Sequence, residues 1–214
     1  MVIINIENTL FIMPLSHLDR FEAAAIKERI AFENFNKKHN IFPTTNHFIQ
    51  YNDASGYDGY DVMITQHDSG VVIMRYLIEI KIRLVGERTL TKCREDGFIL
   101  EMKKLNSMMK IKSLDPNLIK LLYINFTNEG TLSWWVDNIN DGDVQNIPMN
   151  KKTMVNITDK ANKDVCLLPY EKAKKNSYVW SDDQLLPHLN DIEKQRINDR
   201  LIEDKNMIDR LSKR

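Results

Sequence analysis

The sequence predicts an α/β protein with a central mixed sheet of four to five strands, helices on its faces and a C-terminal helical tail. Three observations support this fold class. A long helical pattern comes first, two β-branched strands then form a hairpin, and a second helical pattern leads into two further strands. Helices and strands that alternate along one chain are typical of a sheet covered by helices. The 214 residues, of which 43% are hydrophobic, suffice for one globular core.

The first helix is expected over residues 17–38, with Ser16 as its N-cap. Its apolar residues recur in steps of three and four, apart from one gap. They are Leu18, Phe21, Ala25, Phe32 and Phe35. Glu28 fills the gap, and a carboxylate in an apolar stripe is costly unless it has a partner. Glu28 is therefore either an edge residue whose carboxylate reaches water or an acid directed into a polar site.

A short strand is expected over residues 46–51, followed by a linker over residues 53–59 that is rich in Gly, Asp and Tyr. The hairpin strands are expected over residues 60–66 and 71–84, because both are rich in β-branched residues. Asp68-Ser69-Gly70 is predicted to form a three-residue loop with Gly70 in the left-handed conformation.

This loop sets a register that pairs Asp61 with Leu77. Side chains alternate along a strand, so Leu77, Glu79 and Lys81 share one face. Cross-strand partners also share a face, which places Asp61 diagonal to Glu79 at a Cα separation of roughly 7 Å. A bulge of one residue near the turn would move Asp61 to the other face.

Two carboxylates and a lysine on one face can hold a divalent metal against a phosphodiester. We expect Asp61 and Glu79 to bind Mg²⁺, with Mn²⁺ as a substitute and the backbone carbonyl of Ile80 as a third ligand, because the metal polarises phosphate and acidifies water. Lys81 would orient or deprotonate the attacking water, or stabilise the developing charge. Glu28 would add a further acid. The alternative is that Glu79 and Lys81 are ordinary surface residues of a strand.

The second helix is expected over residues 94–110, with an apolar stripe of Phe98, Met102, Leu105 and Met109. Strands over residues 121–126 and 131–136 follow. Trp134 and Trp135 then point to opposite faces, so one is expected in the core. The other is available to stack on a base or to pack in the ordinary way.

Residues 137–175 are polar, apart from a possible edge strand at residues 165–169. From about residue 182 a charged pattern with intermittent apolar residues predicts a long helix. We therefore expect one domain over residues 1–180 and a charged C-terminal helix over residues 181–214. This helix would cap the domain, pair in a homodimer or dock on a partner.

Charge is balanced overall, with 30 Lys and Arg residues against 30 Asp and Glu residues. Between residues 74 and 120, however, 11 basic residues stand against 6 acidic ones, a surplus of five positive charges. Such a field attracts phosphates, although on charge alone a solvated, lysine-rich helix face is the slightly favoured interpretation.

Several classes of protein are disfavoured by the sequence. The two cysteines have no zinc spacing and fit a reducing compartment. The five histidines show no pair at metal-ligand spacing, and no Walker-type loop or nucleophile elbow is present. No signal peptide or membrane span is expected, so we predict a cytoplasmic protein without a membrane partner.

Residues 17–136, a little over half of the chain, resemble the PD-(D/E)xK nuclease superfamily, which has the restriction-endonuclease-like fold. Its core is a helix, three strands, a helix and a further strand. Asp61 matches the acid that begins the second core strand, although Tyr60 rather than proline precedes it. Glu79 and Lys81 match the (D/E)xK of the third strand. Glu28 matches the acid that some families carry on the first helix.

Two further matches concern accessory residues. Arg83 completes a strand similar to the EVKxR-like strand of many members, and Lys104 corresponds to a polar residue that small phage and bacterial members direct at the site. The resemblance implies an Mg²⁺-dependent nuclease acting on nucleic acid, with DNA as the expected substrate, and in the host cytoplasm if a phage encodes it. The alternative is a non-catalytic nucleic-acid-binding or assembly protein that retains the fold.

Overall fold

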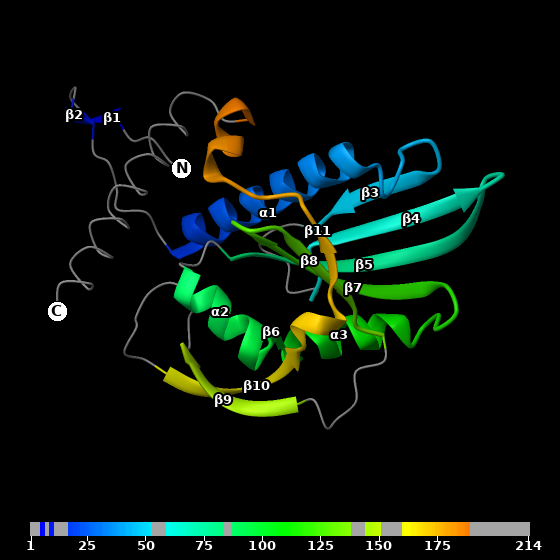
Figure 1. Cartoon of the computed structure of the whole chain (residues 1–214). Coiled ribbons are helices and arrows are strands. Elements are labelled where there is room, and N and C mark those ends of the chain that lie inside the picture. Colours follow the sequence, from blue (N-terminus) through cyan, green and yellow to red (C-terminus); the bar gives the residue numbers. More distant parts are fainter. Residues whose placement is uncertain are drawn as a thin grey trace.

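A six-stranded mixed sheet forms the centre of the computed structural model (Figure 1). The strand order is β11-β8-β7-β5-β4-β3; β5 and β7 pair in parallel, and the other neighbours pair antiparallel. The strands are β3 (His47–Tyr51), β4 (Val62–Asp68), β5 (Val71–Arg83), β7 (Ile119–Thr127), β8 (Thr131–Trp135) and β11 (Lys174–Asn176). The predicted α/β class is confirmed, but the sheet is wider than the predicted four to five strands. The edge strand β11 escapes prediction because its three residues are all polar.

The structure describes residues 5–6, 9–10, 17–52, 59–83, 87–137, 144–150 and 160–188. Short elements are β1 (Asn5–Ile6), β2 (Thr9–Leu10), and the 3₁₀ helices η2 (Tyr170–Lys172) and η3 (Asp182–His188). The first residues of the predicted C-terminal helix form η3, which lies against α1. The rest of that predicted helix lies outside the described residues. Among the helices in the described ranges, none is long and apolar enough to cross a membrane.

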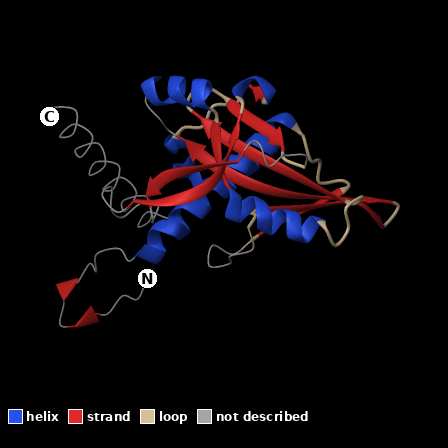
Figure 2. Cartoon of the chain, turned by 90° about the horizontal axis from the view of Figure 1, so that it is seen from below, coloured by secondary structure: helices blue, strands red, loops and turns tan. Residues whose placement is uncertain are grey.

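The helix α1 (His17–His39) covers one face of the sheet, close to the predicted bounds (Figure 1). Its buried Phe32 and Phe35 pack over apolar side chains of β4, β5 and β7. Fully burying such a ring stabilises the fold by roughly 1.5–3 kcal/mol. The opposite face packs against α3 (Met102–Lys112) through Leu105 and Met108. Figure 2 shows the strands running through the middle of the molecule with helices around them.

The prediction of one helix over residues 94–110 is wrong. A helix α2 (Glu87–Asp96) ends at Gly97, which has φ +96° and donates its N–H to the Cys93 carbonyl at 3.0 Å. This left-handed glycine is a common helix stop. The strand β6 (Phe98–Glu101) follows before α3 begins. Phe98 and Leu100 are buried and alternate with half-buried residues, so the apolar period changes here from helical to extended.

A second sheet of three strands has the order β6-β10-β9 and lies beside α2 and α3 (Figure 1). Its other strands are β9 (Val144–Asn150) and β10 (Lys160–Leu168). The edge strand predicted at residues 165–169 is therefore the end of a longer, central strand. This placement depends on β6, which the sequence predicts as helix, so the pairing partner of β10 is hidden from sequence analysis.

The β4–β5 hairpin differs from its predicted register by two residues. Its turn has two residues, Ser69 and Gly70, both with positive φ. This shorter turn shifts the pairing by one residue, and a bulge between Gln66 and His67 shifts it by one more. A shift of two preserves the faces, so Val62 pairs with Ile78, and Asp61 comes level with Glu79.

The two tryptophans of β8 divide between core and surface. Trp134 is 4% exposed and donates its indole N–H to the Pro169 carbonyl at 2.8 Å. Trp135 is 56% exposed, with its ring 6.1 Å from that of Tyr76. The prediction that one of the pair lies in the core is confirmed.

Candidate active site

Asp61 stands where the pairing of β4 with β5 ends. Its backbone N–H donates to the Ile78 carbonyl at 2.8 Å. Its Oδ2 accepts a hydrogen bond from the Ile80 N–H at 2.6 Å. The carboxylate thereby satisfies a backbone donor of β5 that has no partner on β4 at this level. These two bonds hold the Asp61 side chain beside β5.

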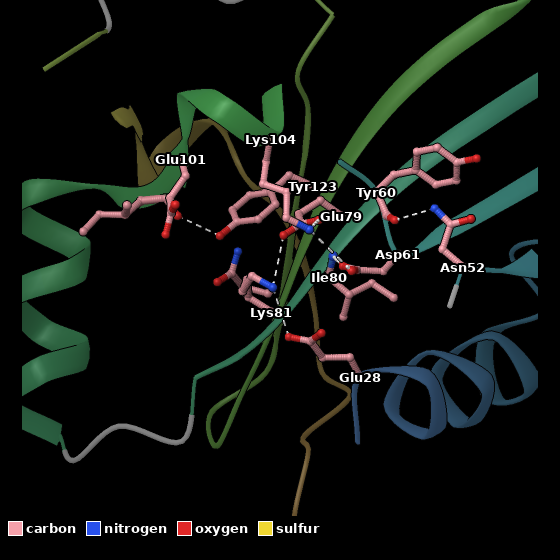
Figure 3. A network of polar contacts seen from close by, with 12 residues as sticks. Glu28, Asn52, Tyr60, Asp61, Glu79, Ile80, Lys81, Glu101, Lys104 and Tyr123 are labelled. Carbon is pink, nitrogen blue, oxygen red and sulfur yellow. Dashed lines mark hydrogen bonds and ion pairs between the residues drawn. The ribbon is translucent and has the colours of Figure 1, made fainter. Parts of the chain in front are cut away.

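Glu79 is the buried acid of the site. Its side chain is only 1% exposed and extends from β5 toward α3 (Figure 3). Lys104 Nζ donates to its Oε2 at 3.1 Å. Lys81 Nζ lies 3.1 Å from its Oε1, yet within the described part of the chain this oxygen receives no hydrogen bond of suitable geometry. Burial raises the pKa of Glu79, with a further rise from Asp61, although the two ammonium groups oppose it.

Lys81 lies two residues beyond Glu79 and therefore on the same face of β5. Its Nζ donates to Glu28 Oε1 at 3.2 Å, and Figure 3 shows Glu28 reaching it from α1. Burial alone would lower the pKa of Lys81, but Glu28, Glu79 and Asp61 together raise it well above its ordinary value. In this arrangement the lysine is held as an ammonium ion.

Glu28 is 14% exposed and directed at Lys81, so its carboxylate belongs to the polar cluster and does not reach freely into water. Burial raises the pKa of the Glu28 carboxyl to about 7; the Lys81 ammonium opposes this rise, while Asp61 and Glu79 add to it. The interruption of the apolar stripe in the sequence therefore marks a residue that turns toward the cluster.

Lys104, in the first turn of α3, contacts Glu79 and Asp61. Its Nζ lies 3.1 Å from Glu79 Oε2 and 3.9 Å from Asp61 Oδ1. The structure thus brings together five of the sequence-predicted residues from α1, β5, α3 and the start of β4 (Figure 3). They are Glu28, Asp61, Glu79, Lys81 and Lys104.

Ile80 contributes through its backbone, because its side chain is buried in the core. The N–H and C=O of one residue in an extended strand point to the same side. Since the Ile80 N–H donates to Asp61, its carbonyl also faces the Asp61 side of β5. That is the orientation a third ligand would need.

Arg83 lies outside the carboxylate cluster. Its Nε donates to Asn125 Oδ1 at 2.7 Å, and its Nη2 donates to the Ile99 carbonyl at 2.9 Å. The Tyr123 hydroxyl donates to the same carbonyl at 2.7 Å. These bonds join β5, β7 and β6 next to the site, so Arg83 is a support for the sheet.

Two polar residues of β7, Tyr123 and Asn125, are not predicted as site residues from the sequence, but they stand opposite Glu79 and Lys81 in the parallel pair of β5 and β7. Asn125 is fully buried, and its Nδ2 has no hydrogen-bond partner among the described residues. A lone asparagine in an apolar strand is a detectable signal. The residues that face it on β5 cannot be predicted, because the register of two parallel strands joined by a long connection leaves no local pattern in the sequence.

No protein-family model and no curated protein matches the sequence. Among solved structures, a nuclease from a fusselovirus is similar over 77% of this chain and 90% of that chain, with 12% identity and a TM-score of 0.39. A similarity this distant carries no argument about function, so the case rests on the side chains themselves.

The donor set fits a hard divalent cation. The Asp61 and Glu79 carboxylates converge on one ammonium group, and Glu79 retains a buried oxygen without a hydrogen bond. Within the described part of the chain, no three His, Cys, Asp or Glu side chains form a complete metal cage. Two carboxylates suffice for Mg²⁺, which keeps several water ligands and also binds substrate phosphate.

The backbone at Gly59, just before Asp61, packs closely against α3. Gly59 has φ +85°, and a Cβ at this position would overlap Ser107 Cβ. Asn52 Nδ2 also donates to the Tyr60 carbonyl at 2.9 Å. Both contacts fix the backbone that presents Asp61, so the distance between Asp61 and Lys104 depends on them.

Proposed function

We propose that this protein is a metal-dependent nuclease with a restriction-endonuclease-like core, and that it hydrolyses phosphodiester bonds of DNA. The observation that carries the proposal is the convergence of two carboxylates, a third acid and a lysine in one cluster. Each comes from the type of element that the PD-(D/E)xK resemblance requires. DNA is proposed over RNA on that resemblance.

Asp61 and Glu79 would hold Mg²⁺, or Mn²⁺ as a substitute, with the Ile80 carbonyl as a further ligand. Once bound, the metal would neutralise phosphate charge and increase the acidity of a water molecule. The Ile80 N–H keeps the Asp61 carboxylate in place. The almost complete burial of Glu79 excludes water from one side of the site, which strengthens electrostatic interactions there.

Lys81 would stabilise the negative charge that develops on the phosphate in the transition state. The Lys81 side chain is 37% exposed, so a substrate oxygen can approach it. Glu28 would act through Lys81, because it holds the ammonium from the side opposite Glu79. We therefore assign Glu28 as a positioning residue and Lys81 as a catalytic residue.

Cleavage of supercoiled plasmid, single-stranded DNA and RNA of matched sequence, each with Mg²⁺, with Mn²⁺ and with a chelator, tests this function. We expect DNA cleavage that requires metal and is lost in Asp61→Ala and Lys81→Ala. Lys110→Ala, on the exposed side of α3, is the matched control and should cleave normally. Activity that survives in both site variants would remove the proposal.

A second function is favoured by one observation. Lys81 and Lys104 already flank the buried Glu79 carboxylate, so its negative charge is balanced without a cation. A non-catalytic nucleic-acid-binding or assembly protein would need no more than this. Calorimetric titration with Mn²⁺ separates the two: binding that depends on Asp61 and Glu79 favours the nuclease, and absence of binding favours the non-catalytic protein.

A further inference from the structure

Lys81 and Lys104 differ in the carboxylates that they contact. Lys81 Nζ lies 3.1 Å from Glu79 and 3.2 Å from Glu28. Lys104 Nζ lies 3.1 Å from Glu79 and 3.9 Å from Asp61. The partners of Lys104 are therefore the same two carboxylates that we propose as metal ligands.

This difference determines what each lysine keeps when a divalent cation occupies Asp61 and Glu79. Lys81 retains Glu28, which lies outside the proposed ligand set. For Lys104, the described part of the chain offers no other carboxylate at ion-pair distance. Its ammonium would also face a cation of like charge at the same oxygens, and repulsion is strong at such short range.

The Lys104 side chain is able to move away from the Asp61 and Glu79 carboxylates. It is 38% exposed, and its flexible four-carbon stem starts in the first turn of α3. The buried contacts of α3 are made by Leu105 and Met108, so movement of Lys104 would not disturb the packing of the helix.

We propose that Lys104 is a displaceable counter-ion of the metal site. The inference rests on the proposed function, since it requires metal ligation by Asp61 and Glu79. In the metal-free protein the ammonium holds these two acids together and offsets their repulsion. It also competes for their oxygens, so the apparent metal affinity is the intrinsic affinity reduced by the fraction of molecules in which Lys104 has left. Lys104 thereby sets the metal concentration at which the site fills.

Limited amine labelling of the native protein tests the displacement directly. The full chain is exposed to a small amount of an amine-reactive ester with and without Mn²⁺, and peptide mass spectrometry measures labelling at each lysine. We expect Mn²⁺ to increase labelling of Lys104, because its amine leaves the two carboxylates. Labelling of Lys110, an exposed lysine on the same helix, should not change.

Calorimetric titration with Mn²⁺ alone measures the competition. If Lys104 is displaced in one metal-free molecule in ten, Lys104→Met should bind Mn²⁺ about tenfold more tightly than wild type. Lys110→Met removes the same charge from the same helix and should bind as wild type does. Lys104→Gln provides a second uncharged variant if the methionine variant does not fold.

The outcomes separate this inference from the function on which it rests. Increased labelling of Lys104 together with tighter binding in Lys104→Met supports the inference. Mn²⁺ binding without a change in Lys104 labelling, or with unchanged affinity in the Lys104 variants, overturns the inference and leaves the metal site intact. Absence of Mn²⁺ binding in wild type and every variant overturns the proposed function as well.

Discussion

Glu79 shows at the scale of one residue how a buried acid is paired within the fold. Its side chain is 1% exposed, and burial raises its pKa. Ammonium groups at 3.1 Å on both oxygens offset that cost. The tripeptide Glu79-Ile80-Lys81 indicates an acid and a base on one face, but not this enclosure. This enclosure depends on Lys104, which reaches Glu79 from α3. The start of α3 is not predicted correctly from the sequence.

Glu28 leads to a prediction about pH. Burial raises the pKa of its carboxyl from 4.5 to about 7, so between these values the folded protein holds a proton that the unfolded chain releases. The stabilisation of the folded state by this proton is complete below pH 4.5 and is lost as pH rises through 7. In metal-free protein, the free energy of unfolding should therefore fall over this range by up to about 3 kcal/mol from this group.

Glu28→Gln removes this titration. The stability of the variant relative to wild type, measured by denaturant unfolding with a chelator present, should increase from pH 5 to pH 8. Glu33→Gln changes an exposed glutamate of α1 that pairs with Arg29, and its difference from wild type should stay within about 0.5 kcal/mol. A constant difference for Glu28→Gln would contradict the raised pKa.

The hairpin illustrates what a sequence can predict at the scale of an element. Its two strands are correctly predicted, while its register is wrong by two residues. The turn and the bulge each contribute one residue, and neither leaves a distinctive pattern. Because the two shifts add up to an even number of residues, Asp61 remains on the face of Glu79. The site is therefore predictable from alternation even though the pairing is not.

Gly59 gives a prediction about the loop that carries Asp61. Gly59→Ala places a methyl group against Ser107 on α3 in a backbone with φ +85°. Gly70→Ala in the hairpin turn is the matched control, since Gly70 has φ +82° but open space around it. The left-handed backbone alone costs an alanine roughly 1–2 kcal/mol.

We expect Gly70→Ala to lose about that much stability and to keep full cleavage activity. Gly59→Ala should lose roughly 1–3 kcal/mol more because of overpacking, and its activity should also fall as Asp61 is displaced. Chemical denaturation and cleavage assays measure both effects. Equal losses in the two variants would show that the contact with α3 does not position the loop.

At the scale of the whole molecule, the α/β class and five strands of the central sheet follow from apolar periodicity. The three-stranded sheet does not, because its strand β6 has only four residues between two helices. Pairing between β6 and β10 joins residues 64 to 70 positions apart in the sequence, and such long-range contacts have no local signature. The site needs only the central sheet, α1 and α3, which explains why most of it is predictable.

The helix expected beyond η3 is predicted from the sequence alone. If its apolar stripe pairs between two chains, the full protein should sediment as a dimer. A dimer would bring two sites to one DNA duplex, as cutting both strands requires. Sedimentation velocity over a range of concentrations, with and without DNA, measures this. A monomer under all of these conditions would exclude pairing through the tail.

The proposed function requires Asp61 and Glu79 to act as one metal-dependent unit. The most direct test is the rate of Mg²⁺-dependent DNA cleavage by wild type, Asp61→Asn, Glu79→Gln and the double variant. Residues that act as a unit are not additive, so each single variant should lose at least about a hundredfold in rate, and the double variant should lose little more. Near-wild-type cleavage in either single variant, or losses that multiply in the double variant, would show that the two carboxylates do not act as one unit.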